Sequence, residues 1–270
     1  MLKGSYTTTS QGASEMPGIE IRNLTKRSCS CNGSKETVFE DFNLKISSSE
    51  TIGLFGPNGC GKTTLLNMVA GIIKPDSGDI IIRGGKKSTV AYIFQDYRNS
   101  LFPWLTIREN IIFPLSIRGT RKKASDEKLE RLRELVNIPF PLEKYPQQLS
   151  GGQQQYVAIL RGLISDPAAM LIDEPFSALD YNNTMWLRDK MTEILETIKI
   201  PTMFVAHDLE HLVYSSDRIC FLSNKPTRVV TEAPINFQRP RVGSMLNYYE
   251  LQRIKGDLID LFSGTKILAV

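Results

Sequence analysis

Residues 56–64 combine glycines, a lysine and two threonines in an order that suits phosphate binding. The pattern is G-x-x-x-x-G-K-T, in which the glycines let the backbone turn tightly, so that successive N–H groups point at one anion. The lysine can reach the phosphates as a point charge, and the hydroxyl of the first threonine can ligate Mg²⁺. The candidate phosphate-binding residues are Gly56, Pro57, Asn58, Gly59, Cys60, Gly61, Lys62, Thr63 and Thr64.

The chain on both sides of this loop supports the assignment. Residues 51–55 form a short apolar run, as a buried strand requires, and apolar residues recur at helical spacing from Leu65 to Ile72. The helix would place the positive end of its dipole beside the phosphates. The sequence therefore predicts a nucleotide site between a strand and a helix.

Two further groups of residues could act on the same nucleotide. Asp173 and Glu174 follow a second apolar run, at the strand end where α/β sheets bind ligands, so Asp173 is a candidate Mg²⁺ ligand and Glu174 a candidate general base. The alternative is a surface pair of carboxylates. Ser150, Gly151, Gly152 and Gln153 precede an apolar helix and form a second anion site, or else an ordinary helix cap.

The bulk composition is that of a globular protein. The chain has 270 residues, of which 41% are hydrophobic and 23% charged, and its net charge of +4 is too weak to indicate nucleic acid but suits an anionic membrane face. We see no secretory signal and no apolar run of about 18 residues. Cys29 and Cys31 lack a second pair or a nearby histidine, so free thiols in a reducing cytoplasm are favoured over a metal site.

The order of the expected elements indicates an α/β fold. Alternating residues at 19–24 and 42–46 predict an antiparallel β layer before the phosphate loop. We expect further strands at 79–83, 90–94, 168–172, 202–206 and 218–222, and helices at 128–136, 156–163, 186–198 and 247–262.

Three segments are expected to stand outside this α/β core. Residues 1–17, rich in Ser, Thr and Gly, predict a disordered tail, with a transit peptide as the alternative. Residues 100–165 are helical in composition and are predicted to form an inserted lobe. Residues 241–270 are predicted to form a C-terminal helical segment.

In this order the motifs resemble those of ATP-binding cassette (ABC) ATPases. Residues 149–153 match the LSGGQ signature of that family, 56–63 its Walker A motif, and 170–174 its Walker B motif with the catalytic glutamate. The resemblance, which covers about residues 18–240, implies a P-loop NTPase core, a mixed sheet flanked by helices, with an N-terminal antiparallel β layer and an inserted helical lobe. It also makes Gln95 the Q-loop glutamine, His207 the switch histidine, and Ser177, Ala178, Leu179 and Asp180 the D-loop.

The resemblance further implies how such a chain works. Two domains pair head to tail, with ATP between the phosphate loop of one and the signature residues, Ser150 to Gln153, of the other. The implied catalytic residues are Glu174, His207, Gln95 and Lys62, and the implied Mg²⁺ ligands are Thr63, Gln95 and Asp173. His211 is expected to be a surface or packing residue.

Residues 94–98, 101–106 and 234–241 resemble the importer ATPases for nitrate, sulfonate, taurine and bicarbonate. This implies an ATPase on the cytoplasmic face of the plasma (inner) membrane, partnered by a second ATPase, by permease subunits that Phe102 and Trp104 would contact, and indirectly by a solute-binding protein. Trp104 could instead lie in the lobe core. A weakly hydrolysing partner in an asymmetric pair and a soluble non-transport ABC ATPase remain alternatives.

Two positions depart from the family pattern. Ser28 stands where the family usually has an aromatic residue that stacks on adenine, and Tyr156 stands where an arginine is common after the signature. Stacking of a base on an aromatic ring contributes about 1–3 kcal/mol.

Because Ser28 cannot stack on adenine, we expect ATP to bind more weakly, or with less preference over GTP, than in the family. Parallel measurement of the KM for ATP and for GTP checks this. A strong preference for ATP at low micromolar concentration would contradict it.

Overall fold

The computed structural model describes residues 18–29, 35–84, 89–95, 100–236, 241, 253–257 and 259–260. The predicted tail at 1–17 and the cysteine at position 31 lie outside the described residues. Of the helix expected over 247–262, only 253–257 and 259–260 are described, and these residues are helical.

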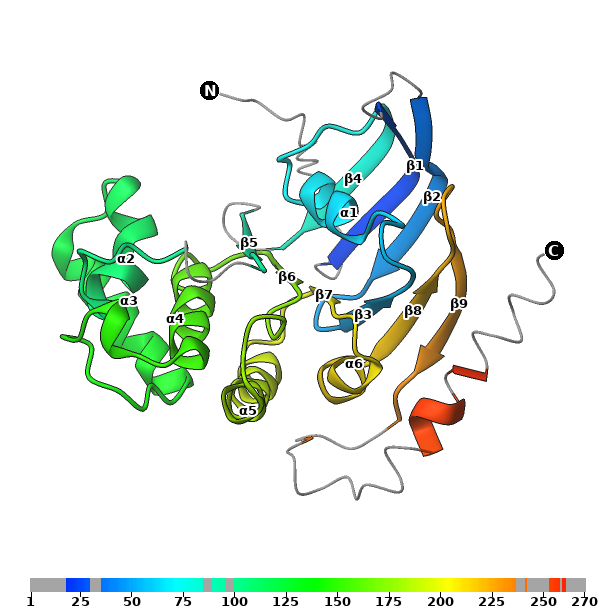
Figure 1. Ribbon diagram of the computed structural model, residues 1–270. Coiled ribbons are helices and arrows are strands. Elements are labelled where there is room, and N and C mark those ends of the chain that lie inside the picture. The colour runs from blue at the N-terminus through cyan, green and yellow to red at the C-terminus, as the bar shows by residue number, and fades with distance from the viewer. Residues whose placement is uncertain are drawn as a thin grey trace.

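A six-stranded sheet forms the centre of the protein (Figure 1). Its order is β5-β6-β7-β3-β8-β9, and every pairing is parallel except that of β9 with β8. Because β5, β6, β7 and β3 are neighbours and parallel, their carboxyl ends line one edge. The strands are β3 (Thr51–Phe55), β5 (Val90–Ile93), β6 (Ala169–Asp173), β7 (Thr202–Val205), β8 (Arg218–Leu222) and β9 (Val229–Pro234).

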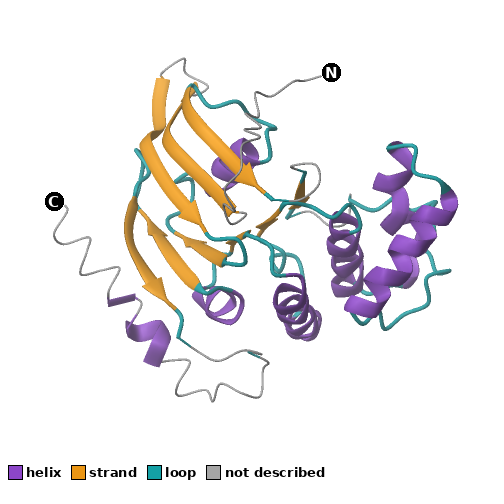
Figure 2. Ribbon diagram, turned by 180° about the vertical axis from the view of Figure 1, so that it is seen from behind, coloured by secondary structure: helices purple, strands orange, loops and turns teal. Residues whose placement is uncertain are grey.

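A smaller antiparallel sheet of β1 (Gly18–Cys29), β2 (Lys35–Ile46) and β4 (Ser77–Arg83) has the order β2-β1-β4. Gly78, at φ +87°, permits the close approach of β4 to β1, since a Cβ there would lie 2.4 Å from the carbonyl oxygen of Asn23. The helix α1 (Lys62–Val69) lies between the two sheets (Figures 1 and 2). Its Leu65 and Leu66 share one apolar core with both sheets.

The opposite face of the large sheet carries a second core. Neighbouring residues of β6 pack into different cores: Leu171 belongs to the core that contains α1, and Ile172 to the core that contains α5 and α6. Continuous apolar strands of this kind are typical of parallel sheets that are covered on both faces. The covering helices are α4 (Gly151–Leu163), α5 (Tyr181–Ile198) and α6 (Leu209–Ser215).

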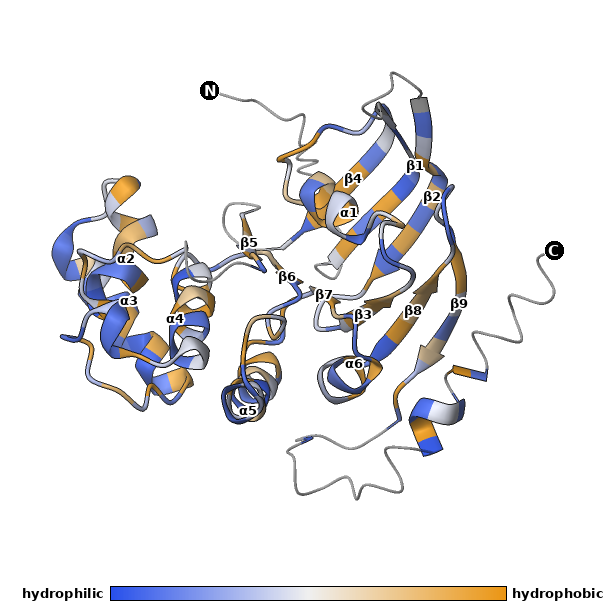
Figure 3. Cartoon of the chain, viewed as in Figure 1, coloured by the Kyte–Doolittle hydropathy of each residue, from blue (hydrophilic) through white to orange (hydrophobic). Residues whose placement is uncertain are grey.

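The helical lobe lies to one side of the sheets (Figure 2). It consists of α2 (Ile107–Ile117), α3 (Lys122–Leu135), a 3₁₀ turn at Pro146–Gln148, and α4, which packs against α2 and α5. Figure 3 shows α3 as mostly hydrophilic, and Leu129 and Leu132 are the apolar residues that α3 buries in the lobe. An ion pair of 2.6 Å from Arg108 to Asp126 joins α2 to α3.

The fold class predicted from the sequence is confirmed, with differences at individual elements. The sequence analysis did not predict β9 or the seven-residue α6. The helix expected from residue 186 begins at Tyr181, because the carboxylate of Asp180 caps it by accepting a hydrogen bond from the N–H of Asn183.

Tyr156, which stands where the family commonly has an arginine, and Trp104 lie in different environments. Tyr156 is fully buried, its hydroxyl donates to the carbonyl oxygen of Asn137 at 2.9 Å, and its ring meets Trp186 edge-on at 5.5 Å. Tyr156 is therefore a core residue that joins α4 to α5 and to the lobe. Trp104 is 71% exposed, so the alternative that placed it in the lobe core is wrong.

Tyr156→Phe is expected to lower the free energy of unfolding by about 1 kcal/mol, because the carbonyl of Asn137 loses its buried donor. Urea denaturation followed by tryptophan fluorescence measures the change, and Tyr181→Phe, at an exposed tyrosine, is the control. Equal stability of the two variants would contradict this role.

His211 is expected to make the fold sensitive to acid. Its ring packs on Phe176, with 4.4 Å between the ring centroids. Burial lowers the pKa of His211 to about 4, although the nearby charge of Asp208 acts to raise it. The unfolded chain takes up this proton near pH 6.5, so the stability present above that pH is lost between pH 6.5 and 4. His211→Gln should flatten this part of the stability profile in urea titrations. A variant with the full wild-type slope would contradict the assignment.

Candidate nucleotide site

The predicted residues of the nucleotide site follow four adjacent parallel strands. The phosphate loop follows β3, His207 follows β7, and Gln95 follows β5, while Asp173 is the last residue of β6 and precedes Glu174. The strand order β5-β6-β7-β3 brings these segments to one edge although they are far apart in the sequence.

The phosphate loop is shaped by close contacts to its neighbours. Gly61 has φ +114°, and a Cβ there would lie 2.7 Å from a methyl carbon of Val38, so the turn requires glycine. Thr227 donates a hydrogen bond to the carbonyl oxygen of Cys60. The thiol of Cys60 is buried, which raises its pKa and keeps it neutral, so it brings no negative charge to the loop.

Lys62 lies over the loop that precedes it. Its side-chain ammonium donates to the carbonyl oxygens of Gly56 at 2.8 Å and of Pro57 at 3.0 Å, and the residue is 8% exposed. The charge is thus held beside the loop's N–H groups, where a phosphate oxygen could replace the carbonyl partners.

Asp173 and Thr63 form the candidate Mg²⁺ site. Asp173 is 5% exposed, burial raises its pKa, and the hydroxyl of Thr63 opposes that shift by hydrogen bonding to its carboxylate. The hydroxyl of Tyr92 donates to the same carboxylate at 3.4 Å. With the amide oxygen of Gln95, these residues offer a hydroxyl, a carboxylate and a carbonyl. Such an oxygen donor set fits Mg²⁺.

Glu174 is the meeting point of the predicted catalytic residues. One of its carboxylate oxygens lies 3.5 Å from the amide nitrogen of Gln95 and 3.5 Å from Nδ1 of His207. Its backbone has φ 45°, and its N–H donates to the carbonyl of Val205 at 3.0 Å. A non-glycine residue in this region costs about 1–3 kcal/mol. The hydrogen bond to Val205 therefore holds a strained backbone that aims the carboxylate between Gln95 and His207.

The signature residues lie elsewhere, at the start of α4. Ser150 caps the helix by accepting from the N–H of Gln153, whose side chain accepts in return from the N–H of Ser150. Among the described residues, no hydrogen bond joins Ser150 or Gln153 to residues 56–64. Figure 1 shows α4, which begins with the signature residues, apart from α1, which follows the phosphate loop, so the two candidate anion sites of one chain stand on separate elements.

The predicted D-loop connects these two regions. The hydroxyl of Ser177 donates to the carbonyl of Glu174 at 3.1 Å, Ala178 is exposed, and Leu179 is half-buried. Asp180 caps α5 and accepts two hydrogen bonds from Asn183, whose side-chain oxygen in turn accepts from Ser150. The D-loop therefore runs from the carboxylate edge to the signature residues.

Sequence reasoning missed two residues that contact the predicted site residues, Tyr92 beside Asp173 and Asn183 beside Ser150. Tyr92 belongs to the predicted strand that ends near Gln95, but its contact with Asp173 requires the pairing of β5 with β6. Asn183 stands three residues after Asp180, a spacing that signals a helix cap but not a contact with Ser150, 33 residues away in the sequence.

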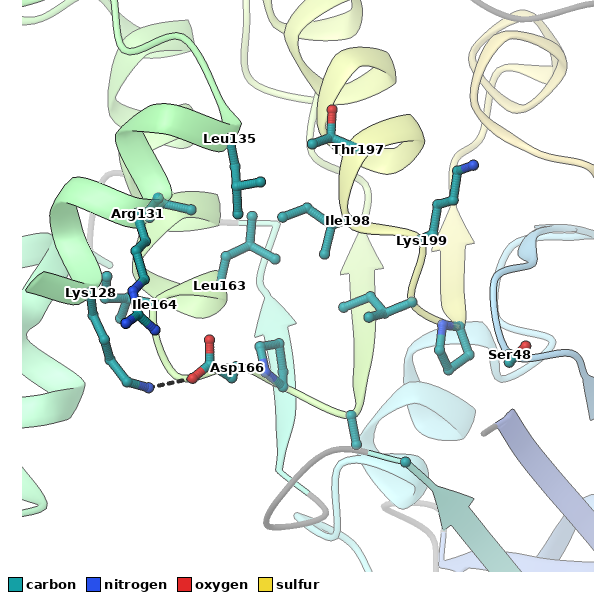
Figure 4. Close-up of a pocket in the computed structure, with 16 residues that line it drawn as sticks. Ser48, Lys128, Arg131, Leu135, Leu163, Ile164, Asp166, Thr197, Ile198 and Lys199 are labelled. Atoms are coloured by element: carbon teal, nitrogen blue, oxygen red, sulfur yellow. Dashed lines mark hydrogen bonds and ion pairs between the residues drawn. The ribbon is translucent and has the colours of Figure 1, made fainter. Parts of the chain in front are cut away.

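A pocket of about 560 Å³ lies away from these residues (Figure 4). Leu135, Leu163 and Ile198 point toward one another inside it, and an ion pair between Lys128 and Asp166 lies at its rim. Since Ala168 and Pro201 also line it, the pocket lies near the amino ends of β6 and β7, opposite the nucleotide edge.

Comparison with known proteins agrees with this geometry. The family model for the ABC transporter matches residues 39–177. An uncharacterized ABC transporter ATP-binding protein of Methanocaldococcus jannaschii is 34% identical over 239 residues, which cover 87% of this chain and 88% of that protein. The aliphatic sulfonates import ATP-binding protein of Bacillus licheniformis is 37% identical over 211 residues, or 77% of this chain and 81% of that protein.

A solved dimeric structure of a bacterial ABC transporter cassette is similar to 82% of this chain and to 100% of its own, with a TM-score of 0.62 and 28% identity. The match of the family model and the identity to these relatives lead to one conclusion: the chain belongs to the ABC transporter family and is one of its ATP-binding ATPases.

Proposed function

We propose that this ATPase powers an importer for a small anion and that Glu174 is its general base. The observation that supports the role of Glu174 is its approach to both Gln95 and His207, at 3.5 Å each, on the edge that also holds Lys62 and Asp173, and the importer is supported by the similarity to a sulfonate import ATP-binding protein. A carboxylate between an amide and an imidazole can accept a proton from water while both neighbours orient that water.

The other residues bind and orient the nucleotide. Lys62 exchanges its carbonyl partners for β- and γ-phosphate oxygens, and the N–H groups of the loop surround the same phosphates. His207, whose side chain is 59% exposed, would face the γ-phosphate in this arrangement. Thr63, Asp173 and Gln95 would hold Mg²⁺, which neutralises phosphate charge.

Two chains, identical or different, pair head to tail in this proposal. Ser150 of each chain stands at the start of α4 and donates to Asn183 of α5, so in this proposal a second chain supplies the signature residues. The dimeric state of the similar cassette supports this arrangement. ATP would then join two subunits, and its hydrolysis would release them.

The proposed membrane partner is a permease that contacts the exposed aromatic residues of the lobe. Trp104 stands out from the surface beside Phe102, whose ring packs at 4.4 Å on Phe113. No helix among the described residues is long and apolar enough to cross a membrane. We place the chain at the cytoplasmic face of the membrane, with a solute-binding protein as an indirect partner.

Among the candidate solutes, an aliphatic sulfonate, the chemical class to which taurine belongs, is favoured over nitrate and bicarbonate. The support is the similarity to the aliphatic sulfonates import ATP-binding protein of Bacillus licheniformis. The close grouping of Glu174, Gln95 and His207 favours an active ATPase over a weakly hydrolysing regulatory partner.

Co-purification from native membranes in mild detergent tests the importer proposal. We expect a polytopic permease and a solute-binding protein, and binding of sulfonates to that protein identifies the solute. A second, different ATPase in the complex would establish an asymmetric pair. Recovery with ribosomes or nucleic acid, without a permease, would overturn the proposal.

Glu174→Gln is expected to reduce ATP turnover by about 10²–10⁴-fold while ATP remains bound, because an amide cannot accept the proton of water. Phosphate release and retention of labelled ATP measure the two effects. Glu143→Gln, at an exposed glutamate outside the site, is the matched control. Normal turnover of Glu174→Gln would remove Glu174 from its proposed role.

A further inference from the structure

Asp180 fixes the orientation of the Asn183 side chain. One carboxylate oxygen accepts from the backbone N–H of Asn183 at 3.0 Å, and the other accepts from its side-chain nitrogen at 2.5 Å. These hydrogen bonds hold the pKa of Asp180 below its usual range, so the carboxylate is ionised at neutral pH. An ionised carboxylate only accepts hydrogen bonds. The amide nitrogen of Asn183 must therefore face Asp180, and its oxygen must face away.

That oxygen accepts a hydrogen bond from the hydroxyl of Ser150. The two oxygens are 2.7 Å apart, and since Oδ1 of Asn183 carries no hydrogen, Ser150 has to be the donor. A serine hydroxyl has a single hydrogen, and its oxygen already accepts from the N–H of Gln153 at 3.4 Å. In this state Ser150 has no hydrogen to donate to a phosphate.

Close packing keeps the amide beside the hydroxyl. A Cβ on Gly152 would lie 3.0 Å from the backbone oxygen and 3.1 Å from the side-chain oxygen of Asn183, so the starts of α4 and α5 nearly touch. Further along, Tyr156 and Trp186 join the same two helices. With the helices held together, Ser150 breaks this hydrogen bond by turning its hydroxyl away from Asn183.

We infer that Asn183 competes with the partner subunit's nucleotide for the Ser150 hydroxyl hydrogen and thereby weakens ATP binding in the dimer. Asn183 is thus a positioning residue that acts through Ser150. The inference rests on the proposed head-to-tail pairing, in which Ser150 meets a phosphate of the nucleotide held by the other chain. Asn183, in the first turn of α5 next to the D-loop, thus controls how tightly the signature residues bind the nucleotide.

Two substitutions of Asn183, by Leu and by Asp, should shift the KM for ATP in opposite directions. Asn183→Leu keeps the size but removes the acceptor, so the KM should fall about two- to tenfold, the effect of one ordinary hydrogen bond. Asn183→Asp adds a carboxylate beside Ser150 that accepts more strongly and repels phosphate, so the KM should rise at least tenfold. The kcat of Asn183→Leu should stay within about twofold, since Asn183 touches no reacting group.

The test measures KM and kcat for ATP on the full chain purified with its membrane partners. Asn182→Ala is the matched control, because Asn182 is an exposed asparagine of the same turn. The decisive comparison is a double-mutant cycle with Ser150→Ala. Thermal melting of every variant separates a loss of folding from a change of KM, and Asn183→Ala replaces Asn183→Leu if the latter does not fold.

We expect Asn183→Leu to lower the KM in the presence of Ser150 and to change nothing in the Ser150→Ala background. An unchanged or raised KM for both Asn183→Leu and Asn183→Ala, or the same decrease in both backgrounds, would overturn the inference. If Ser150→Ala alone leaves the KM and kcat unchanged, the proposed contact of Ser150 with the partner subunit's nucleotide fails. The two failures are therefore distinguishable.

Discussion

The parallel alignment of four neighbouring strands is the constraint on which the rest of the structure depends. Backbone hydrogen bonds between β5, β6, β7 and β3 fix the carboxyl ends at one edge, and each end supplies one part of the site. Such a sheet has to be covered on both faces. The two apolar cores meet this requirement: α1 covers one face and carries Lys62, and α5 covers the other and begins at the D-loop.

The fold also explains why the site is divided. The strand edge carries the candidate phosphate-binding residues and the candidate base, whereas Ser150 belongs to α4, which packs on the lobe and on α5. In the proposed dimer the two parts of one site come from different chains. Glu174 shows how local strain serves this arrangement, because its left-handed backbone is held by Val205 on the neighbouring strand.

The sequence predicted the residues whose chemistry follows local patterns. The phosphate loop, Asp173 and the cap at Ser150 each stand beside an apolar strand or helix, so short-range periodicity reveals them. It could not predict contacts that depend on strand order or helix packing, such as Tyr92 with Asp173 or Asn183 with Ser150. The sequence also could not predict that Trp104 is exposed, because an aromatic residue in a helical lobe can lie in the core or on the surface.

The helix α4 has a mechanical consequence. It starts at Ser150, and further along it Gln155, fully buried, donates to the carbonyl of Phe94, the residue before Gln95. A helix of 13 residues is about 20 Å long, so a tilt of about 5° displaces one end by about 2 Å relative to the other. That displacement exceeds the tolerance of a hydrogen bond. Ser150 and the contact to Phe94 thus depend on one helix, so any tilt of α4 displaces Ser150 and Gln155 together.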